Sequence, residues 1–364
     1  MIRKSVKSTT STLNNQRSVC HIVRRFGRVG GMESYVWHLS HCQLDLGYQV
    51  NVITEEILDC YDCRIYVIPI KRAFSKHRYQ QMLEFRALVS AAIKSNKSLN
   101  GAVIHSHERS TGHHVTTFHG SPMLVGFLNR LLSKRVRAWL EMEGTELLSD
   151  SCKAIVPVSR TLGKLLARIY PAAETKIRSP GYPGVLKSNG AAMQVDLPPR
   201  LLFVGKEWKR KGLDRSLRIF KMFKERYPGA TLDVFGPSTD QRLKIESAGA
   251  VYHGWSADID FSRFHILIHP ALIEPFGMVV SEALAIGCGV LCSNQVGARE
   301  LLENSPQIVS VRVSASDKYW CSALCRLWEA REQFALVHVP TWPDLASFYD
   351  TIYNDLSVIE KSQV

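Results

Sequence analysis

The sequence predicts an α/β protein built from two doubly wound, Rossmann-like domains that face a central cleft. Its 364 residues are too many for one ordinary core, and 45% of them are apolar, so each half can form a core of its own. Short apolar runs alternate with amphipathic stretches, which is typical of parallel sheets with crossover helices. Ligands of such sheets bind beyond the carboxyl ends of the strands, and the cleft is therefore the expected site.

The first predicted domain covers residues 18–180. Ser18–Arg24 has the composition of a buried strand, and after a glycine-rich loop the stretch Glu33–Leu46 predicts a helix that ends at Gly47. Other short apolar runs predict its remaining strands: Gln49–Thr54, Ala102–His105, Val115–Phe118 and Ala154–Val158. Residues 1–17 are polar and contain no apolar run, so we expect a flexible leader and not a signal peptide.

The second predicted domain covers residues 200–340 and follows a linker at residues 181–199. The linker prediction depends on the prolines and glycines that crowd residues 179–200. After the linker the alternation begins again. Helices are expected at Arg215–Tyr227 and Met278–Ile286, and strands at Leu201–Val204, Thr231–Phe235, Ile266–His269 and Gly289–Cys292.

The excess positive charge lies entirely in the first half of the chain. Residues 1–178 contain 26 Lys and Arg against 13 Asp and Glu, whereas residues 179–364 contain 20 of each. The excess indicates either a solvated basic surface or an anionic partner: a phosphorylated acceptor, an acidic membrane face or nucleic acid. Within this half, Gly126–Leu140 has the spacing of a basic amphipathic helix. Such a helix either lies on an anionic bilayer, with Phe127 and Trp139 inserted, or packs against the core.

The cysteine and apolar patterns favour a cytoplasmic protein. The nine cysteines are an odd number and stand mostly in apolar contexts, as expected in a reducing compartment. No stretch of 18 or more apolar residues is present, so no membrane span is expected. Cys60 and Cys63 form one C-x-x-C motif, but no second such motif or histidine pair stands at the spacing of a zinc site. Several histidines also stand close together in the sequence, but their spacing does not define a metal site. We therefore expect no metal and no other cofactor.

Two segments of the second half carry the clearest chemistry. In Glu274–Glu282 (EPFGMVVSE) two glutamates stand on either side of a helix start, where Gly277 lets the backbone approach a ligand. The amides at that helix start favour a phosphate, and the carboxylates can accept hydrogen bonds from hydroxyl groups. In Val204–Gly212 (VGKEWKRKG) a strand end is followed by Lys206, Arg210 and Lys211, and cations there would stabilise a departing diphosphate. Together the segments suit a nucleotide sugar.

These segments resemble motifs of glycosyltransferase family 4. Glu274–Glu282 resembles the family's E-P-F-G-x-x-x-x-E signature, and Val204–Gly212 resembles V-G-R-x4-K-G, with a lysine where arginine is usual. Gly30–Glu33 resembles the N-terminal G-G-x-E loop, and Thr117–Gly120 resembles the T-x-H-G segment. Leu213–Ser216 continues in the style of lipopolysaccharide core glucosyltransferases. The order and spacing agree from about residue 18 to residue 302.

The resemblance implies a GT-B fold and a retaining transfer that needs no metal. Lys211 would bind the donor diphosphate with Lys206 or Arg210 beside it, Glu274 would touch the hexose, and Glu282 the ribose. His119 would contact the sugar near the scissile bond, so Glu274, His119 and Lys211 form the implied catalytic set. The remaining implied donor contacts are Gly31, Phe276, Gly277, Met278 and Val279.

Two further points follow from the resemblance. Residues 341–364 would form a C-terminal helix, beginning near Trp342, that returns to the first domain. The lipopolysaccharide core glucosyltransferases carry an aspartate soon after the glycine pair, where this chain has Tyr35. Whether Tyr35 takes the place of a catalytic carboxylate is left open by the sequence.

The predicted function is transfer of a hexose from a nucleotide sugar, a UDP-sugar rather than a GDP-sugar, to a lipopolysaccharide core or other envelope glycan. The anionic, lipid-linked acceptor would be met at the inner face of the cytoplasmic membrane. One alternative is a basic nucleic-acid-binding protein, although no RNA-binding aromatic motif, zinc finger or recognition helix is recognisable. Another is a nicotinamide-dependent oxidoreductase, but Gly27–Gly31 has the pattern G-R-V-G-G instead of G-x-G-x-x-G.

Overall fold

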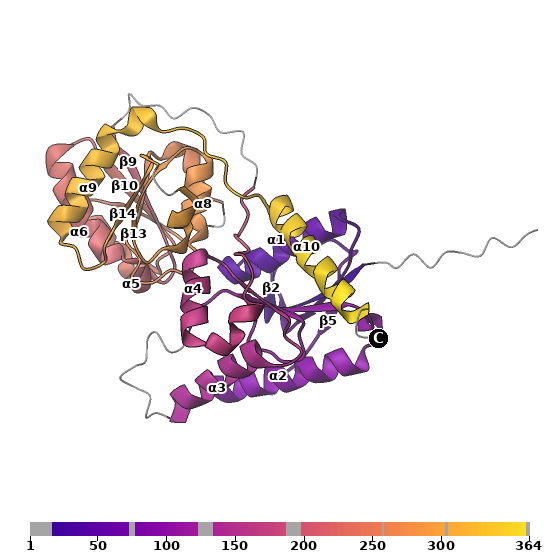
Figure 1. Cartoon of the computed structure of the whole chain (residues 1–364). Helices are drawn as coiled ribbons and strands as arrows, with labels where there is room; N and C mark the ends of the chain where they lie inside the picture. Colours follow the sequence, from indigo (N-terminus) through magenta and orange to yellow (C-terminus); the bar gives the residue numbers. More distant parts are fainter. Residues whose placement is uncertain are drawn as a thin grey trace, which may run out of the picture.

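The computed structural model describes residues 17–72, 77–122, 134–186, 198–256, 258–302 and 305–361. Residues 1–16 of the predicted leader and 187–197 of the predicted linker lie outside these ranges. Figure 1 shows two lobes, each with a twisted sheet covered by helices. The fold is therefore the two-domain α/β architecture that the alternation of apolar runs predicts.

The first domain contains a six-stranded parallel sheet. Its strands, in spatial order, are β5 (Tyr66–Pro69), β3 (Gln49–Thr54), β1 (Ser18–Ile22), β6 (Val103–Ser106), β7 (Val115–Phe118) and β8 (Ala154–Pro157). A short ladder pairs β2 (Arg25–Phe26) with β4 (Glu56–Ile57). The helices are α1 (Gly31–Asp45), α2 (Arg78–Ser95), α3 (Lys134–Leu148) and α4 (Arg160–Ile169).

The second domain repeats this arrangement. Its parallel sheet has the order β11 (Val251–Gly254), β10 (Thr231–Phe235), β9 (Arg200–Val204), β12 (Ile266–His269), β13 (Gly289–Ser293) and β14 (Ile308–Val311). Its helices are α5 (Trp208–Lys211), α6 (Leu213–Arg226), α7 (Arg242–Ser247), α8 (Met278–Ala285) and α9 (Asp317–Glu329). In both sheets the strand order reverses beside the first strand, β1 or β9, and ligands bind at such switch points.

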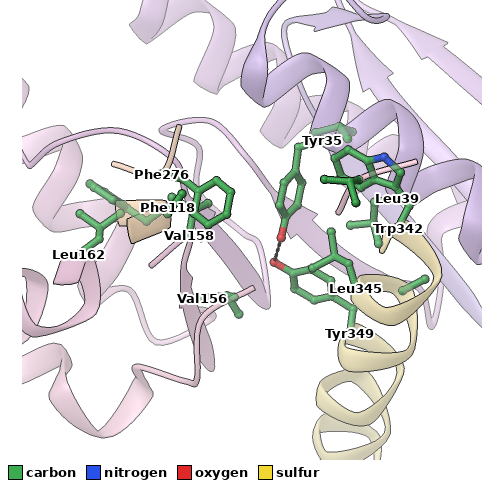
Figure 2. Close-up of a cluster of buried hydrophobic side chains, with 14 of the residues drawn as sticks. Tyr35, Leu39, Phe118, Val156, Val158, Leu162, Phe276, Trp342, Leu345 and Tyr349 are labelled. Carbon is green, nitrogen blue, oxygen red and sulfur yellow. Dashed lines mark hydrogen bonds between the residues drawn. The ribbon is translucent and has the colours of Figure 1, made fainter. Parts of the chain in front are cut away.

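The last helix, α10 (Trp342–Lys361), returns to the first domain and packs beside α1 (Figure 1). The indole of Trp342 stacks on the His38 ring, with centroids 4.5 Å apart. In Figure 2 the hydroxyl of Tyr349 on α10 meets that of Tyr35 on α1 inside the same apolar cluster. Burial of these aromatic side chains anchors α10, because each aromatic ring removes a large apolar area from water.

Glu300, from the turn after β13, links the second domain to the first. Its carboxylate accepts hydrogen bonds from the backbone amides of Arg160 and Thr161 at the start of α4, the latter at 3.2 Å. The hydroxyl of Tyr182 donates to the same carboxylate at 2.9 Å. A carboxylate at a helix start satisfies unpaired amides and meets the positive end of the helix dipole. This contact fixes one edge of the cleft.

The basic segment Gly126–Leu140 is described only from residue 134 on, where α3 begins. Val136 and Trp139 are buried, and the Trp139 ring packs against Tyr79 and the guanidinium of Arg109. The interpretation of Trp139 as a membrane-inserting side chain is therefore wrong, and Phe127 lies outside the described residues. Among the described helices, none combines the length and apolarity that crossing a bilayer requires.

Candidate active site between the two domains

The loop between β12 and α8 shapes the second-domain wall of the site. Gly277 ends this loop with φ +96°, a left-handed conformation that favours glycine, and a Cβ there would lie 3.1 Å from Cγ of Glu274. The turn places the carboxylate of Glu274 against two cations. Lys211 Nζ lies 2.7 Å and Arg210 Nη1 lies 3.1 Å from Glu274 Oε2. Two of the three sequence-predicted cations, Lys211 and Arg210, thus converge on Glu274.

Glu274 is buried and ionised within this cluster. Burial alone would raise the pKa of Glu274, but His269 and the charges of Lys211 and Arg210 together hold it well below its ordinary value. The His269 ring is fully buried at the end of β12, and its Nε2 lies 3.5 Å from Glu274 Oε2, too far for a good hydrogen bond. Neither ring nitrogen of His269 has a hydrogen-bond partner among the described residues. No sequence motif marks His269, which is recognisable only as the last residue of a strand that leads to Glu274.

The short helix α5 positions Lys211. The aliphatic part of its side chain lies over Gly205, where a Cβ would approach Lys211 Cγ to 2.9 Å. Gly212 then ends α5 with φ +83°, and a Cβ at this residue would collide with the carbonyl oxygen of Pro270 at 2.3 Å. Close packing therefore explains both glycines of the Val204–Gly212 motif: Gly205 leaves room for the Lys211 side chain, and Gly212 leaves room for the backbone of Pro270.

Glu282 lies one turn into α8, and its carboxylate faces no donor or cation at bonding distance among the described residues. It is mostly buried, and no hydrogen bond or ion pair joins its carboxylate to the described residues. Burial raises the pKa of Glu282 to about 7, and the charge of Lys211 lowers it only in part. A buried carboxylate without a protein partner is costly unless a ligand supplies hydrogen-bond donors. Glu282 therefore has the chemistry expected of a hydroxyl-binding residue.

The other predicted donor contacts differ in what their side chains do. Phe276 is buried and its ring packs against Tyr182 from the interdomain connection, so only its backbone is available to a ligand. Met278 and Val279 are half-buried at the start of α8. A Cβ at Gly31, at the start of α1, would lie 3.7 Å from Met278 Sδ. Gly31 therefore faces α8 across the cleft at van der Waals distance.

Lys206 points across the cleft and not toward Lys211. Its Nζ donates a hydrogen bond of 3.1 Å to the carbonyl oxygen of Val29 in the first domain. The same ammonium lies 4.4 Å from the ring centroid of Trp255, which is 55% exposed. The structure thus joins Lys206 to the glycine-rich loop before α1, a contact that the motif alone does not predict.

His119 supplies the first-domain side of the site, directly after β7. Its Nε2 lies 3.0 Å from Nδ1 of His107. Its ring is nearly perpendicular to the Tyr35 ring, and the two ring centroids lie 4.8 Å apart. Burial lowers the pKa of His119 to about 3, so the ring is neutral at physiological pH. Tyr35 itself is fully buried and donates its hydroxyl hydrogen to the carbonyl oxygen of Gly181. Tyr35 therefore forms hydrogen bonds within the core and does not take the place of a catalytic carboxylate in the cleft.

Three histidines behind His119 lie close enough to share a metal ion. One ring nitrogen from each of His21, His105 and His107 lies within 4.8 Å of the others. Every ring nitrogen of the three, however, already has a hydrogen-bond partner in the protein. The residues therefore fit a hydrogen-bond network without a metal. His105 and His107 stand close together in the sequence, but His21 lies in an earlier strand, and the sequence does not show which of the three are bonded to each other.

The two halves of the chain match two protein-family models. Residues 29–179 match the model of Glycosyltransferase Family 4, and residues 198–330 match that of Glycosyl transferases group 1. The first match contains His119 and Gly31, and the second contains Lys211, Glu274 and Glu282.

Two curated relatives differ in the molecules that their names state. Glycogen synthase of Mycobacterium tuberculosis is 26% identical over 59% of this chain, and the match spans 58% of its own length. The phosphatidylinositol N-acetylglucosaminyltransferase GPI3 subunit of Saccharomyces cerevisiae is 23% identical over 80% of this chain and 71% of its own. One name refers to a polysaccharide and the other to a lipid.

Two solved structures share the fold. WaaG, described as a glycosyltransferase involved in lipopolysaccharide biosynthesis, has a TM-score of 0.73 at 17% identity, with 91% of this chain and 94% of WaaG covered. HepE from Anabaena, solved in complex with UDP-glucose, has a TM-score of 0.62 at 13% identity and covers 95% of this chain and 100% of its own. At these identities the likeness establishes the fold of the chain.

Proposed function

Since the chain belongs to the family 4 glycosyltransferases and has the GT-B fold, we propose that it transfers a hexose from a UDP-sugar to a lipopolysaccharide core or another cell-envelope glycan. Membership of this family is the reason to prefer a glycosyltransferase over the two alternative functions, a nucleic-acid-binding protein and a nicotinamide-dependent oxidoreductase. The observation that carries the proposal is the cluster of Lys211, Arg210 and Glu274 beside the start of α8, with the unpartnered carboxylate of Glu282 one turn further on.

This cluster suits the charge changes of the transfer. When the bond between the sugar and the diphosphate breaks, negative charge develops on the leaving phosphate. Lys211 and Arg210 would stabilise that charge together with the amides at the start of α8. Two protein cations at this position support a transfer that needs no metal ion. That the transfer retains the anomeric configuration is proposed on the resemblance to the family alone. Glu282 would accept hydrogen bonds from the ribose, and Glu274 would orient the cations and touch the hexose.

The donor proposal is supported by HepE, which was solved with UDP-glucose. A melting-temperature panel with UDP, GDP, dTDP and their sugars tests it, because a ligand that binds only the folded state stabilises that state by mass action. We expect the largest shift with UDP or a UDP-sugar, and the same shift after treatment with EDTA. A larger shift with GDP would overturn the choice of base, and loss of the shift with EDTA would overturn metal independence. No shift with any nucleotide would contradict the donor site itself.

The acceptor proposal is supported by the described biology of WaaG, by the lipid named for the GPI3 subunit and by the basic first half of the chain. We propose that this half meets an anionic acceptor at the inner face of the cytoplasmic membrane. Each Lys or Arg near an anionic surface contributes about 1 kcal/mol, and the effect fades within a Debye length. Because Trp139 is packed in the core, binding would depend on charge and be reversible.

Vesicle co-sedimentation tests the membrane part. The comparison is between the wild type and a variant in which four basic residues become glutamine: Arg130, Lys134, Arg135 and Arg137. We expect binding to anionic vesicles, little to neutral ones, and a marked loss in the variant or at high salt. If the wild type does not bind anionic vesicles, the basic first half contacts only the acceptor and not the membrane surface. A variant that binds like the wild type would move the docking surface elsewhere.

A further inference from the structure

A continuous chain of hydrogen bonds runs through the core of the first domain from the backbone of Gly181 to His119. In order, its members are Gly181, Tyr35, Tyr349, Thr117, His105, Tyr353, Gln43, His21, His107 and His119. We call this set the polar chain. All of its side chains are fully buried except that of His119, which is partly exposed. Two of its members, Tyr349 and Tyr353, come from α10.

The direction of the first bonds is fixed by the Gly181 carbonyl oxygen, which can only accept. Tyr35 donates to it at 3.0 Å and has no second hydroxyl hydrogen to give. Tyr35 therefore accepts from Tyr349, whose oxygen lies 2.9 Å away. With its own hydrogen used in this way, Tyr349 accepts from Thr117 at 2.5 Å. Thr117 in turn accepts from Nε2–H of His105 at 2.7 Å.

The donors and acceptors in the middle of the polar chain are determined in the same way. A neutral imidazole has one donor and one acceptor nitrogen, so Nδ1 of His105 accepts from the hydroxyl of Tyr353 at 2.6 Å. Tyr353 then accepts from the amide nitrogen of Gln43 at 3.3 Å. This orients the amide of Gln43 so that its oxygen faces His21. Nε2–H of His21 donates to that oxygen at 2.6 Å.

The last bonds determine which nitrogen of His119 carries the hydrogen. Since His21 donates through Nε2, its Nδ1 accepts from Nε2–H of His107 at 3.1 Å. Nδ1 of His107 is then an acceptor and receives Nε2–H of His119 at 3.0 Å. Nδ1 of His119 keeps a lone pair and has no hydrogen-bond partner among the described residues.

These bond directions hold for neutral imidazoles, and the surroundings of the rings keep them neutral. Burial lowers the pKa of His21 to about 4, although the bond to Gln43 opposes the shift. Burial, together with the neighbouring rings, holds the pKa values of His105 and His107 well below the ordinary value. No carboxylate takes part in the polar chain, so none of its members supplies a negative charge that would stabilise an imidazolium.

We propose that the polar chain is a positioning device for His119: it holds the ring in the Nε2–H tautomer and presents Nδ1 as an acceptor to a hydroxyl group of the transferred sugar. The ligand in this statement rests on the proposed function, whereas the tautomer does not. His107, His21, Gln43 and the two α10 tyrosines are therefore positioning residues. A tyrosine more than 200 residues from His119 in sequence would thus decide whether His119 accepts or donates.

Tyr349→Phe tests the device at a distance from the cleft. The variant deprives Thr117 of its acceptor, and Thr117 can regain one only by donating to Nε2 of His105. Every later bond then reverses, and His119 becomes the Nδ1–H tautomer. Thr117→Val is a second route to the same reversal, because it removes the acceptor of His105 Nε2–H and a buried N–H without an acceptor is costly. Tyr48→Phe is the matched control, since the Tyr48 hydroxyl bonds Asp350 on α10 at 2.7 Å and lies outside the polar chain.

The measurement is the tautomer of His119 from long-range 1H–15N NMR spectra, assigned by comparison with His119→Asn. We expect Nε2–H in the wild type and in Tyr48→Phe, and Nδ1–H in Tyr349→Phe or Thr117→Val. Nδ1–H in the wild type, or an unchanged tautomer in both variants, would overturn the device. Stoichiometric zinc in the purified protein would also overturn it, because His21, His105 and His107 would then be ligands.

Sugar transfer from a UDP-sugar tests the ligand part separately. Tyr349→Phe should lower kcat/KM about ten-fold, the effect of losing one hydrogen bond in the transition state, and leave affinity for free UDP unchanged. Tyr48→Phe should leave both unchanged. A reversed tautomer with unchanged transfer would show that the sugar does not use Nδ1. A wild type that binds no nucleotide would instead refute the proposed function, while the NMR result on the tautomer would still stand.

Discussion

The two walls of the cleft are built from opposite kinds of polar chemistry. In the second domain Glu274 lies between two cations and is held ionised, and the half-buried carboxylate of Glu282 has no hydrogen-bond or ion-pair partner in the part of the chain that the structure describes. In the first domain His119 ends a set of buried, uncharged groups that are fully hydrogen-bonded to one another. Charges respond strongly to a departing diphosphate, whereas a neutral network fixes geometry without adding charge. We therefore expect the second domain to set the energy of bond cleavage and the first to set the position of the sugar.

The largest effect is expected from the charged wall. Lys211→Ala should lower kcat/KM about 10²- to 10³-fold, since losing one preorganised group that stabilises developing charge costs about 2.7–4 kcal/mol. It should also lower the free energy of unfolding by about 1–3 kcal/mol, because Glu274 stays buried with one cation fewer. Turnover assays and thermal unfolding measure the two effects.

Lys209→Ala is the matched control for that experiment. Lys209 lies in the same short helix but is exposed, and its ammonium lies over the Trp208 ring. This variant should change neither activity nor stability by more than a small amount. Wild-type turnover in Lys211→Ala would refute the diphosphate role of Lys211, and equal losses in both variants would mean that only net charge matters.

An intermediate effect, with opposite signs for binding and stability, is expected at Glu282. Its folded pKa of about 7 lies above the ordinary value of 4.5, so between these values the folded state retains a proton that the unfolded state has released. The wild type therefore loses stability as the pH rises through this window. Glu282→Gln should remove the loss and raise the free energy of unfolding at pH 8 by about 1–3 kcal/mol.

The same variant should weaken binding of free UDP, because the ribose is present with or without the sugar. Glu274→Gln is the comparison: it should depress transfer but leave free UDP binding largely intact, since Lys211 and Arg210 remain. Calorimetric titration with UDP measures both affinities. If both variants bind UDP like the wild type, Glu282 does not contact the ribose.

The motifs predicted the second-domain wall better than the first. The E-x7-E spacing and the glycines around Lys211 are local features, so a short stretch of sequence contains most of their geometry. The polar chain, in contrast, joins residues from α1, three strands and α10, and sequence spacing does not reveal such pairings. The histidines at the ends of β1 and β6 were a visible signal, but only the packing of Tyr349 and Tyr353 from α10 shows what they bond.

The charge count shows a similar limit. The excess of basic residues in the first half is real, yet several arginines there are paired with carboxylates. Arg24 and Arg72 both bind Glu55, Arg28 binds Asp59, and the remaining pairs include Arg25–Glu33, Arg64–Asp62 and Arg109–Glu143. Net charge predicts the sign of the partner but not which side chains are available to it. Helical spacing likewise left Trp139 either on a membrane surface or in the core, and the structure places it in the core.

The smallest expected effect lies where the two walls meet, at Lys206. The family motif assigns this residue to the diphosphate, whereas the structure joins it to Val29 across the cleft and to the ring of Trp255. Because both contacts are largely exposed, Lys206→Ala should raise KM for the donor only about two- to five-fold, with kcat nearly unchanged. Trp255→Leu, which removes the stacking surface but keeps the charge, should have an effect of similar size. A loss as large as that of Lys211→Ala, without a matching loss in Trp255→Leu, would mean that Lys206 leaves Val29 when the donor binds and joins Lys211 at the diphosphate.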